Sequence, residues 1–139
     1  MSQSNEVAVG EAGSDVGLEG TFHTGYFCFR NQLGGPIISG RAKHWTSDGA
    51  EAEIDLAGLA NDTVSASKGF ITNTGNVDHW SFKATLADGT VCHVDDKHCA
   101  FKTSDTGSTV TMSAVLQSLK GTLTINIGSG NCSENFKAV

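Results

Sequence analysis

The sequence predicts an all-β fold, a single antiparallel β-sandwich of about eight or nine strands. The chain of 139 residues has seventeen glycines and one proline, and it is rich in threonine, serine and valine, which is typical of short strands joined by tight turns. Turn signals recur about every 8–12 residues. Helical periodicity is nearly absent, and the best helix candidate, residues 50–59, fits a short strand and a turn equally well.

Nine segments carry the strand pattern in chain order. Asp88-Gly89 predicts a tight hairpin between the fifth and sixth, and the last alternates strictly, with Leu123, Ile125 and Ile127 between polar residues. The expected strands are 21–31, 37–46, 51–56, 64–73, 79–86, 90–94, 98–103, 109–116 and 121–127. The turns between them are expected at residues 32–36, 47–49, 73–76, 88–89, 95–97 and 104–108.

Residues 1–20 are expected to form a flexible N-terminal tail before a β-sandwich domain of residues 21–139. The tail lacks the basic and apolar regions of a signal peptide, and no run of about eighteen apolar residues is present to span a membrane as a helix. The expected protein is soluble. It is either cytosolic, exported by a non-classical route or represented here in a mature form, and the compartment stays open.

The charge balance narrows the range of partners. Nine basic residues stand against fifteen acidic ones, which gives a net charge of −6 and a pI near 5.2. Because nucleic-acid binding needs a dense basic surface, we expect no nucleic-acid partner. A lipid head group or a sugar remains compatible with this charge.

Strand parity separates two kinds of side chain in residues 78–86, because successive side chains of a strand point to opposite faces. Trp80 and Phe82 alternate with His79 and Ser81, so we expect Trp80 to be buried and His79 to face outward. The residues expected to face inward are Phe27, Phe29, Trp80, Phe82, Leu86, Leu123, Ile125 and Ile127.

The second strand places its tryptophan differently. Arg41, Lys43 and Trp45 share one parity, so if the charges face outward, Trp45 faces outward beside two cations. An exposed indole next to cations suits a sugar ring or a lipid interface. In the alternative interpretation, Trp45 lies near the strand end and is covered by a loop.

Several further side chains complete the candidate ligand-binding set, which consists of Arg41, Lys43, Trp45, His44, His79 and Asp78. The alternative is a small enzyme whose pocket combines His44, His79 and Asp78. No nucleophile, zinc-protease or phosphate-loop motif accompanies these residues, so a binding module is favoured and no catalytic residue is assigned. A structural module that self-associates through a sheet edge is a third alternative.

The segment from Cys92 to Cys99 offers two thiols, two imidazoles and two carboxylates. Zinc sites usually show two separated ligand pairs, so this spacing is more typical of a hairpin whose ends are joined by a Cys92–Cys99 disulfide. Cys28 and Cys132 would then be the remaining pair, although three pairings are open in principle. Plain buried thiols are the alternative. We expect neither a metal site nor a cofactor.

A set of short motifs resembles a known group of proteins. The motifs are Phe29-Arg30-Asn31, Lys43-His44-Trp45, the run from Gly69 to Gly75, Asp78-His79-Trp80 and Asp88-Gly89. Their order resembles a group of small β-sandwich proteins of fungi, bacteria and nematodes that is similar in architecture to the aegerolysins, over about residues 21–127. The resemblance implies binding to membrane lipids, recruitment of a pore-forming partner, and a place in a toxin-like or defence system. The site residues above come from strand parity.

Together these observations predict a non-enzymatic recognition module that binds a membrane lipid head group or a glycan. The expected binding surface includes Trp45, and a membrane surface is among the expected partners. The ligand and the oligomeric state are left open.

Overall fold

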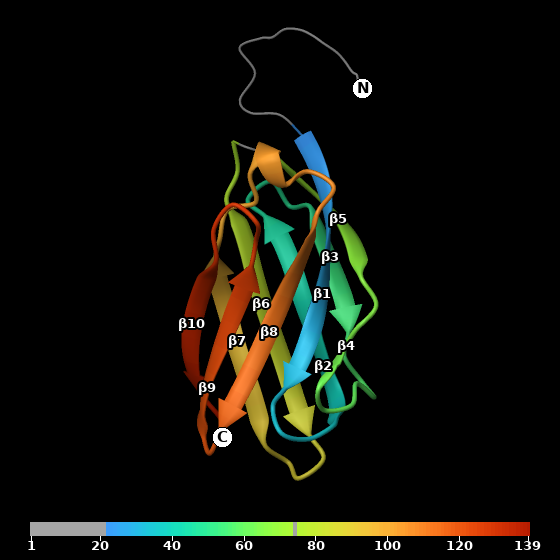
Figure 1. The fold of residues 1–139 in the computed structure, drawn as a ribbon, viewed down its shortest axis with the longest axis vertical. Helices are drawn as coiled ribbons and strands as arrows, with labels where there is room; N and C mark the ends of the chain where they lie inside the picture. Colours follow the sequence, from blue (N-terminus) through green and yellow to red (C-terminus); the bar gives the residue numbers. More distant parts are fainter. Residues whose placement is uncertain (1–21, 74) are drawn as a thin grey trace, which may run out of the picture.

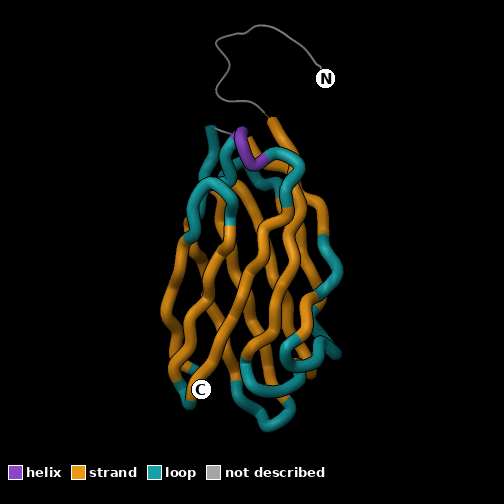
Figure 2. The backbone as a smooth tube through the Cα atoms, viewed as in Figure 1, coloured by secondary structure: helices purple, strands orange, loops and turns teal. Residues whose placement is uncertain are grey.

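A computed structural model describes residues 22–73 and 75–139 of the chain (Figure 1). The strands are β1 (Phe22–Gln32), β2 (Ile37–Thr46), β3 (Glu51–Asp55), β4 (Thr63–Val64), β5 (Lys68–Asn73), β6 (Asp78–Leu86), β7 (Val91–His98), β8 (Thr109–Gln117), β9 (Lys120–Asn126) and β10 (Cys132–Lys137). A short 3-10 helix, η1 (Thr103–Asp105), is the one helix of the described residues, and it lies among loops at one end of the molecule (Figure 2). The predicted all-β class is confirmed.

The strands form two sheets. Sheet A has six strands in the order β10-β9-β8-β1-β4, with β5 also paired to β1, and sheet B has the order β3-β2-β6-β7. The expectation of purely antiparallel pairing was wrong, because β1 and β8 pair in parallel from Tyr26↔Thr109 to Gln32↔Val115. Parallel neighbours require a long connection. In the chain, the connection between β1 and β8 contains all four strands of sheet B.

Side chains from the inner faces of both sheets meet in one hydrophobic core. Phe27 of β1 packs edge-on against Trp80 of β6 with ring centroids 5.9 Å apart, and Phe29 lies 5.3 Å from Phe82. All eight residues that parity placed inside are buried. The alternation of apolar and polar residues therefore identified the inner face correctly on β1, β6 and β9.

The hairpin between β6 and β7 shows how local sequence sets the strand ends. Gly89 has a φ of +91°, a conformation that glycine adopts without steric cost. The Asp88 carboxylate accepts a hydrogen bond from the backbone N–H of Thr90 at 2.9 Å. The predicted Asp88-Gly89 turn is therefore present.

Four expectations about individual elements were wrong. Residues 95–97 do not form a turn but lie inside β7, which runs to His98, and the expected strand 98–103 is replaced by a loop and η1. The expected strand 64–73 is divided into β4 and β5, and β10 was not expected at all. The described residues thus hold ten strands instead of eight or nine.

The predicted tail, residues 1–20, lies outside the described residues. Among the residues that the structure does describe, no helix is long and apolar enough to cross a membrane.

Candidate functional site

The outer face of sheet B carries a row of four side chains that crosses all of its strands. Glu51 of β3 pairs with Trp45 of β2, Trp45 pairs with His79 of β6, and His79 pairs with His98 of β7. Directly opposed side chains of neighbouring strands lie close enough to interact. Pairing therefore lines up a carboxylate, an indole and two imidazoles on one surface.

Trp45 and His79 form the centre of this row. Their rings stack almost in parallel, with an interplanar angle of 10° and centroids 5.0 Å apart. The Lys43 ammonium lies 5.6 Å from the indole centroid, within cation–π range. Trp45 is half-buried and Trp80 is fully buried, so the predicted difference between the two tryptophans is confirmed.

The two cations expected beside Trp45 are paired with carboxylates of β3. Arg41 lies 3.7 Å from Glu53, and Lys43 lies 3.5 Å from Glu51. Sequence reasoning missed these partners, although Glu51 and Glu53 share one parity around Ala52, which was a visible signal. The surface around Trp45 is consequently polar and charge-balanced instead of basic.

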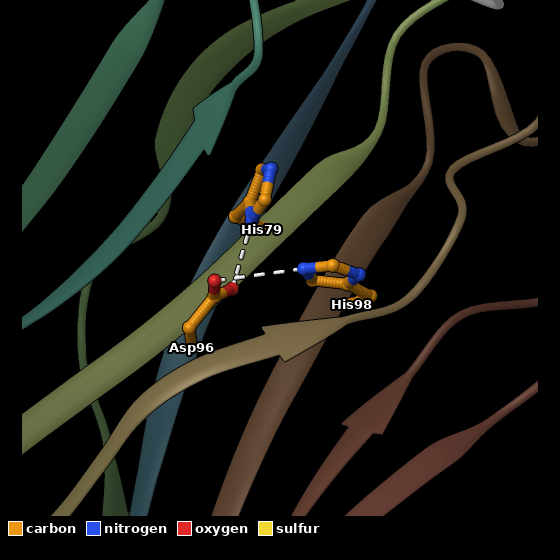
Figure 3. A group of neighbouring side chains, drawn as sticks. All are labelled: His79, Asp96 and His98. Atoms are coloured by element: carbon orange, nitrogen blue, oxygen red, sulfur yellow. Dashed lines mark hydrogen bonds and ion pairs between the residues drawn. The ribbon is translucent and has the colours of Figure 1, made fainter.

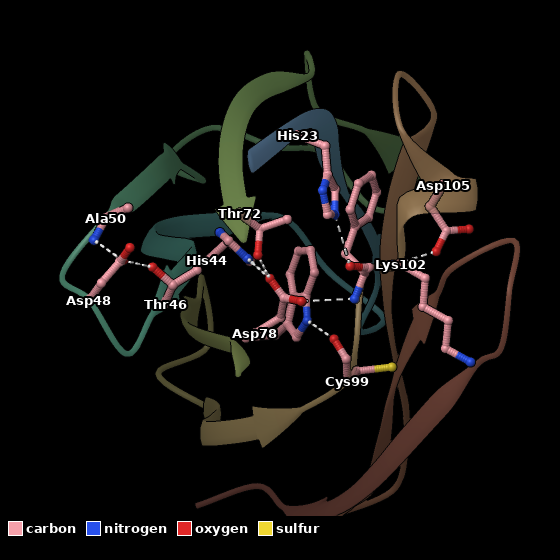
Figure 4. Close-up of polar contacts among 12 residues, drawn as sticks. His23, His44, Thr46, Asp48, Ala50, Thr72, Asp78, Cys99, Lys102 and Asp105 are labelled. Atoms are coloured by element: carbon pink, nitrogen blue, oxygen red, sulfur yellow. Dashed lines mark hydrogen bonds and ion pairs between the residues drawn. The ribbon is translucent and has the colours of Figure 1, made fainter. Parts of the chain in front are cut away.

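His44 and Asp78, which were included in the candidate ligand-binding set, lie on the inner side of sheet B and not on this surface. Both are buried, with His44 Nε2 2.8 Å from Asp78 Oδ1 (Figure 4). The same carboxylate accepts hydrogen bonds from Thr72 Oγ1 at 2.5 Å and from the backbone N–H of Phe101 at 2.8 Å. Asp78 thus joins β2, β5, β6 and the segment after β7.

His44 is incompletely satisfied. Its Nδ1 is buried and has no hydrogen-bond partner among the described residues. The residue contributes to the lining of an edge cleft of about 570 Å³ between β1, β3 and β5, together with Tyr26, Gly69 and Phe70. His79 points to the opposite side of the sheet, so the alternative enzyme pocket that combines His44, His79 and Asp78 is not formed.

The cysteine pairing also differs from the expectation. The disulfide joins Cys99 to Cys132, and Cys28 and Cys92 are free and buried. The expected Cys92–Cys99 bridge was wrong because both residues lie on or next to a continuous strand instead of at the two ends of a hairpin. Burial, followed by the charge of Asp88, raises the pKa of the Cys92 thiol.

Comparison with protein-family models finds no match to the chain, and comparison with curated proteins finds no significant match. The functional argument therefore depends on the geometry of the outer face of sheet B.

Proposed function

We propose that this chain is a non-enzymatic β-sandwich that recognises a glycan through the outer face of sheet B. The observation that carries the proposal is the stacking of Trp45 on His79 within a row of polar side chains. A sugar presents apolar C–H faces and a rim of hydroxyl groups. An indole supports the first kind of contact, and carboxylates and imidazoles form hydrogen bonds with the second.

The proposed surface lies on rigid elements. Trp45 and His79 belong to β2 and β6, the two central strands of sheet B, and each has a neighbouring strand on both sides. Beneath them, His44 and Trp80 pack in the core. Side chains held by strands are more precisely placed than side chains on loops, which lowers the entropy lost when a ligand binds.

Charge favours a neutral glycan over an anionic lipid head group. Arg41 and Lys43 already have Glu53 and Glu51 as carboxylate partners, and Asp96 places a further carboxylate on the same face. An anionic head group would have to displace these carboxylates from the cations. A neutral hydroxyl-rich ligand accepts and donates hydrogen bonds without that competition.

A different surface would serve a lipid bilayer. Phe22, Tyr26 and Ile71 are exposed on the outer face of sheet A, where β1 pairs with β5. Exposed aromatic and aliphatic side chains suit the membrane interface. The resemblance to aegerolysins would favour a lipid ligand. Because the two surfaces lie on different sheets, the two ligand classes are separable by mutation.

The test is a glycan array together with a vesicle-binding assay on phosphatidylcholine with and without an anionic lipid. We expect selective glycan binding that Trp45→Ala weakens by about thirtyfold, as for an aromatic anchor worth about 2 kcal/mol. The matched control Phe22→Ala removes an exposed aromatic residue from the other sheet and leaves glycan binding unchanged. Binding to vesicles alone, lost in Phe22→Ala and kept in Trp45→Ala, would overturn the proposal.

A further inference from the structure

A second group of side chains adjoins Trp45 on the outer face of sheet B. His79, Asp96 and His98 place one donor atom each within 4.8 Å of one another (Figure 3). His79 Nδ1 lies 2.8 Å from Asp96 Oδ1, and His98 Nε2 lies 3.5 Å from Asp96 Oδ2. The two imidazole rings meet edge to face, with centroids 4.5 Å apart.

A β-bulge brings these three side chains together. Phe82 pairs with Val94 and Trp80 pairs with Lys97, so the single residue Ser81 faces two residues of β7, Asp95 and Asp96. Without the extra residue, Asp96 would share the buried parity of Val94. The bulge shifts the parity, so that Asp96 and His98 both face solvent. Bulges are frequent beside functional sites because they redirect side chains in this way.

Trp45 holds one of the three donors in place. The His79 ring stacks on the indole, and its side chain is only 16% exposed, whereas the side chains of Asp96 and His98 are 44% and 61% exposed. The arrangement therefore combines one ordered imidazole with two side chains that can adjust. Partners that orient a ligating histidine ring typically strengthen metal binding.

We propose that His79, Asp96 and His98 form a binding site for a divalent transition-metal ion of the zinc and copper class. Imidazole nitrogen suits zinc and copper, and two imidazoles with one carboxylate leave coordination positions open to water or a further ligand. Bonds of about 2.1 Å in a tetrahedron place donors about 3.4 Å apart. The 2.8 Å contact between His79 and Asp96 must therefore lengthen slightly, as the metal replaces the proton shared by these two groups.

The chain supplies its own matched control. His93 and Asp95 also form an imidazole–carboxylate pair at 2.8 Å on β7, and both are exposed. No third donor joins this pair within the part of the chain that the structure describes. If metal bound nonspecifically to surface histidines, it would bind both at the His93–Asp95 pair and at the three-donor group. A specific three-donor site would bind metal only at His79, Asp96 and His98.

The experiment titrates the protein, without any histidine tag, with zinc chloride by calorimetry and with copper chloride by tryptophan fluorescence. Trp80→Phe serves as the background in the second assay, so that the emission comes from Trp45, which stacks on His79. We expect one zinc ion per chain and saturable copper quenching, with affinity lowered at least about tenfold by His98→Ala or Asp96→Asn. We expect His93→Ala to stay within about twofold of the parent.

Equal zinc uptake by the parent and His98→Ala, or an equal loss in His93→Ala, would overturn the metal site. Circular dichroism of each variant shows whether the fold is kept, and both ligand substitutions are at exposed positions. Because the metal ion alone is the probe, the result does not depend on whether the same face binds a glycan.

Discussion

Removal of the Cys99–Cys132 disulfide measures how firmly the C-terminal strand is held. The bridge closes a loop with a sequence separation of 33 residues, from the end of β7 to the start of β10. For a loop of this length the chain-entropy relation gives about 4 kcal/mol at 25 °C. We therefore expect the double substitution of Cys99 and Cys132 by alanine to lower the melting temperature by about 10–20 °C.

The fold is expected to survive this loss, because other contacts hold the C-terminal segment. Lys97 and Glu134 form an ion pair at 3.4 Å, and Val91 and Val139 exchange two backbone hydrogen bonds of 2.8 and 3.0 Å. Urea unfolding followed by circular dichroism gives the free energy directly. The control Cys28→Ala removes a buried but unbridged thiol and is expected to cost about 1 kcal/mol. Equal stability of the double variant and the parent, or a peptide map that links Cys92 to Cys99, would refute the reasoning.

Three further results are expected. Trp80→Ala lowers the free energy of unfolding by about 3–5 kcal/mol, because the indole is fully buried and donates a hydrogen bond to the Cys99 carbonyl at 2.9 Å; an equal loss in Trp45→Ala would contradict the assignment of the two faces. Burial raises the pKa of Asp105, but hydrogen bonds from Ser129 and from the backbone N–H of Lys102 outweigh it and leave the pKa below its usual value. A pKa that is lower in the folded than in the unfolded state stabilises the fold above the unfolded value, and this contribution is lost as the pH falls through the folded value. Asp105→Asn is therefore expected to cost about 1–3 kcal/mol at neutral pH, with the difference from the parent shrinking below about pH 4 in urea titrations; a constant difference would argue against this origin. Iodoacetamide is expected to leave the Cys92 thiol unlabelled in the native protein and to label it in urea, because burial raises its pKa; rapid native labelling would show that the strand opens.

Among the sequence patterns, strand parity predicted the burial of side chains best. On β2 and β6 the alternation placed Trp80 inside and left Trp45 partly exposed, as the structure has them. Parity works on these strands because each has one buried and one solvent-facing side. It also placed His44 opposite Trp45, and the burial of His44 follows from the same alternation.

The bulge in β7 escaped prediction because it looks like a turn in the sequence. Asp95-Asp96-Lys97 is a polar run after an apolar strand, and polar runs usually end strands. In the structure the run continues the ladder with one extra residue. Only the partner strand shows this, since the two residues face the single Ser81. The proximity of Asp96 and His98 to His79 could not be read from the local segment alone.

Long-range pairings were the other features beyond local sequence. The parallel contact of β1 with β8 joins segments separated by all of sheet B, and no turn signal marks it. Cys99 meets Cys132 because the end of β7 and the start of β10 lie near each other in space. Local spacing favoured the nearer partner, Cys92, although a strand holds Cys92 in the core.

The emission of Trp45 during glycan titration tests the central claim most directly. In the Trp80→Phe variant the only tryptophan lies at the centre of the proposed surface, stacked on His79. We expect a glycan selected from the array to change this emission saturably, with the midpoint equal to the dissociation constant from calorimetry. We expect the Phe22→Ala variant to bind the same glycan at a single site with unchanged affinity. Glycan binding with full affinity that leaves the Trp45 emission constant would contradict recognition through the outer face of sheet B.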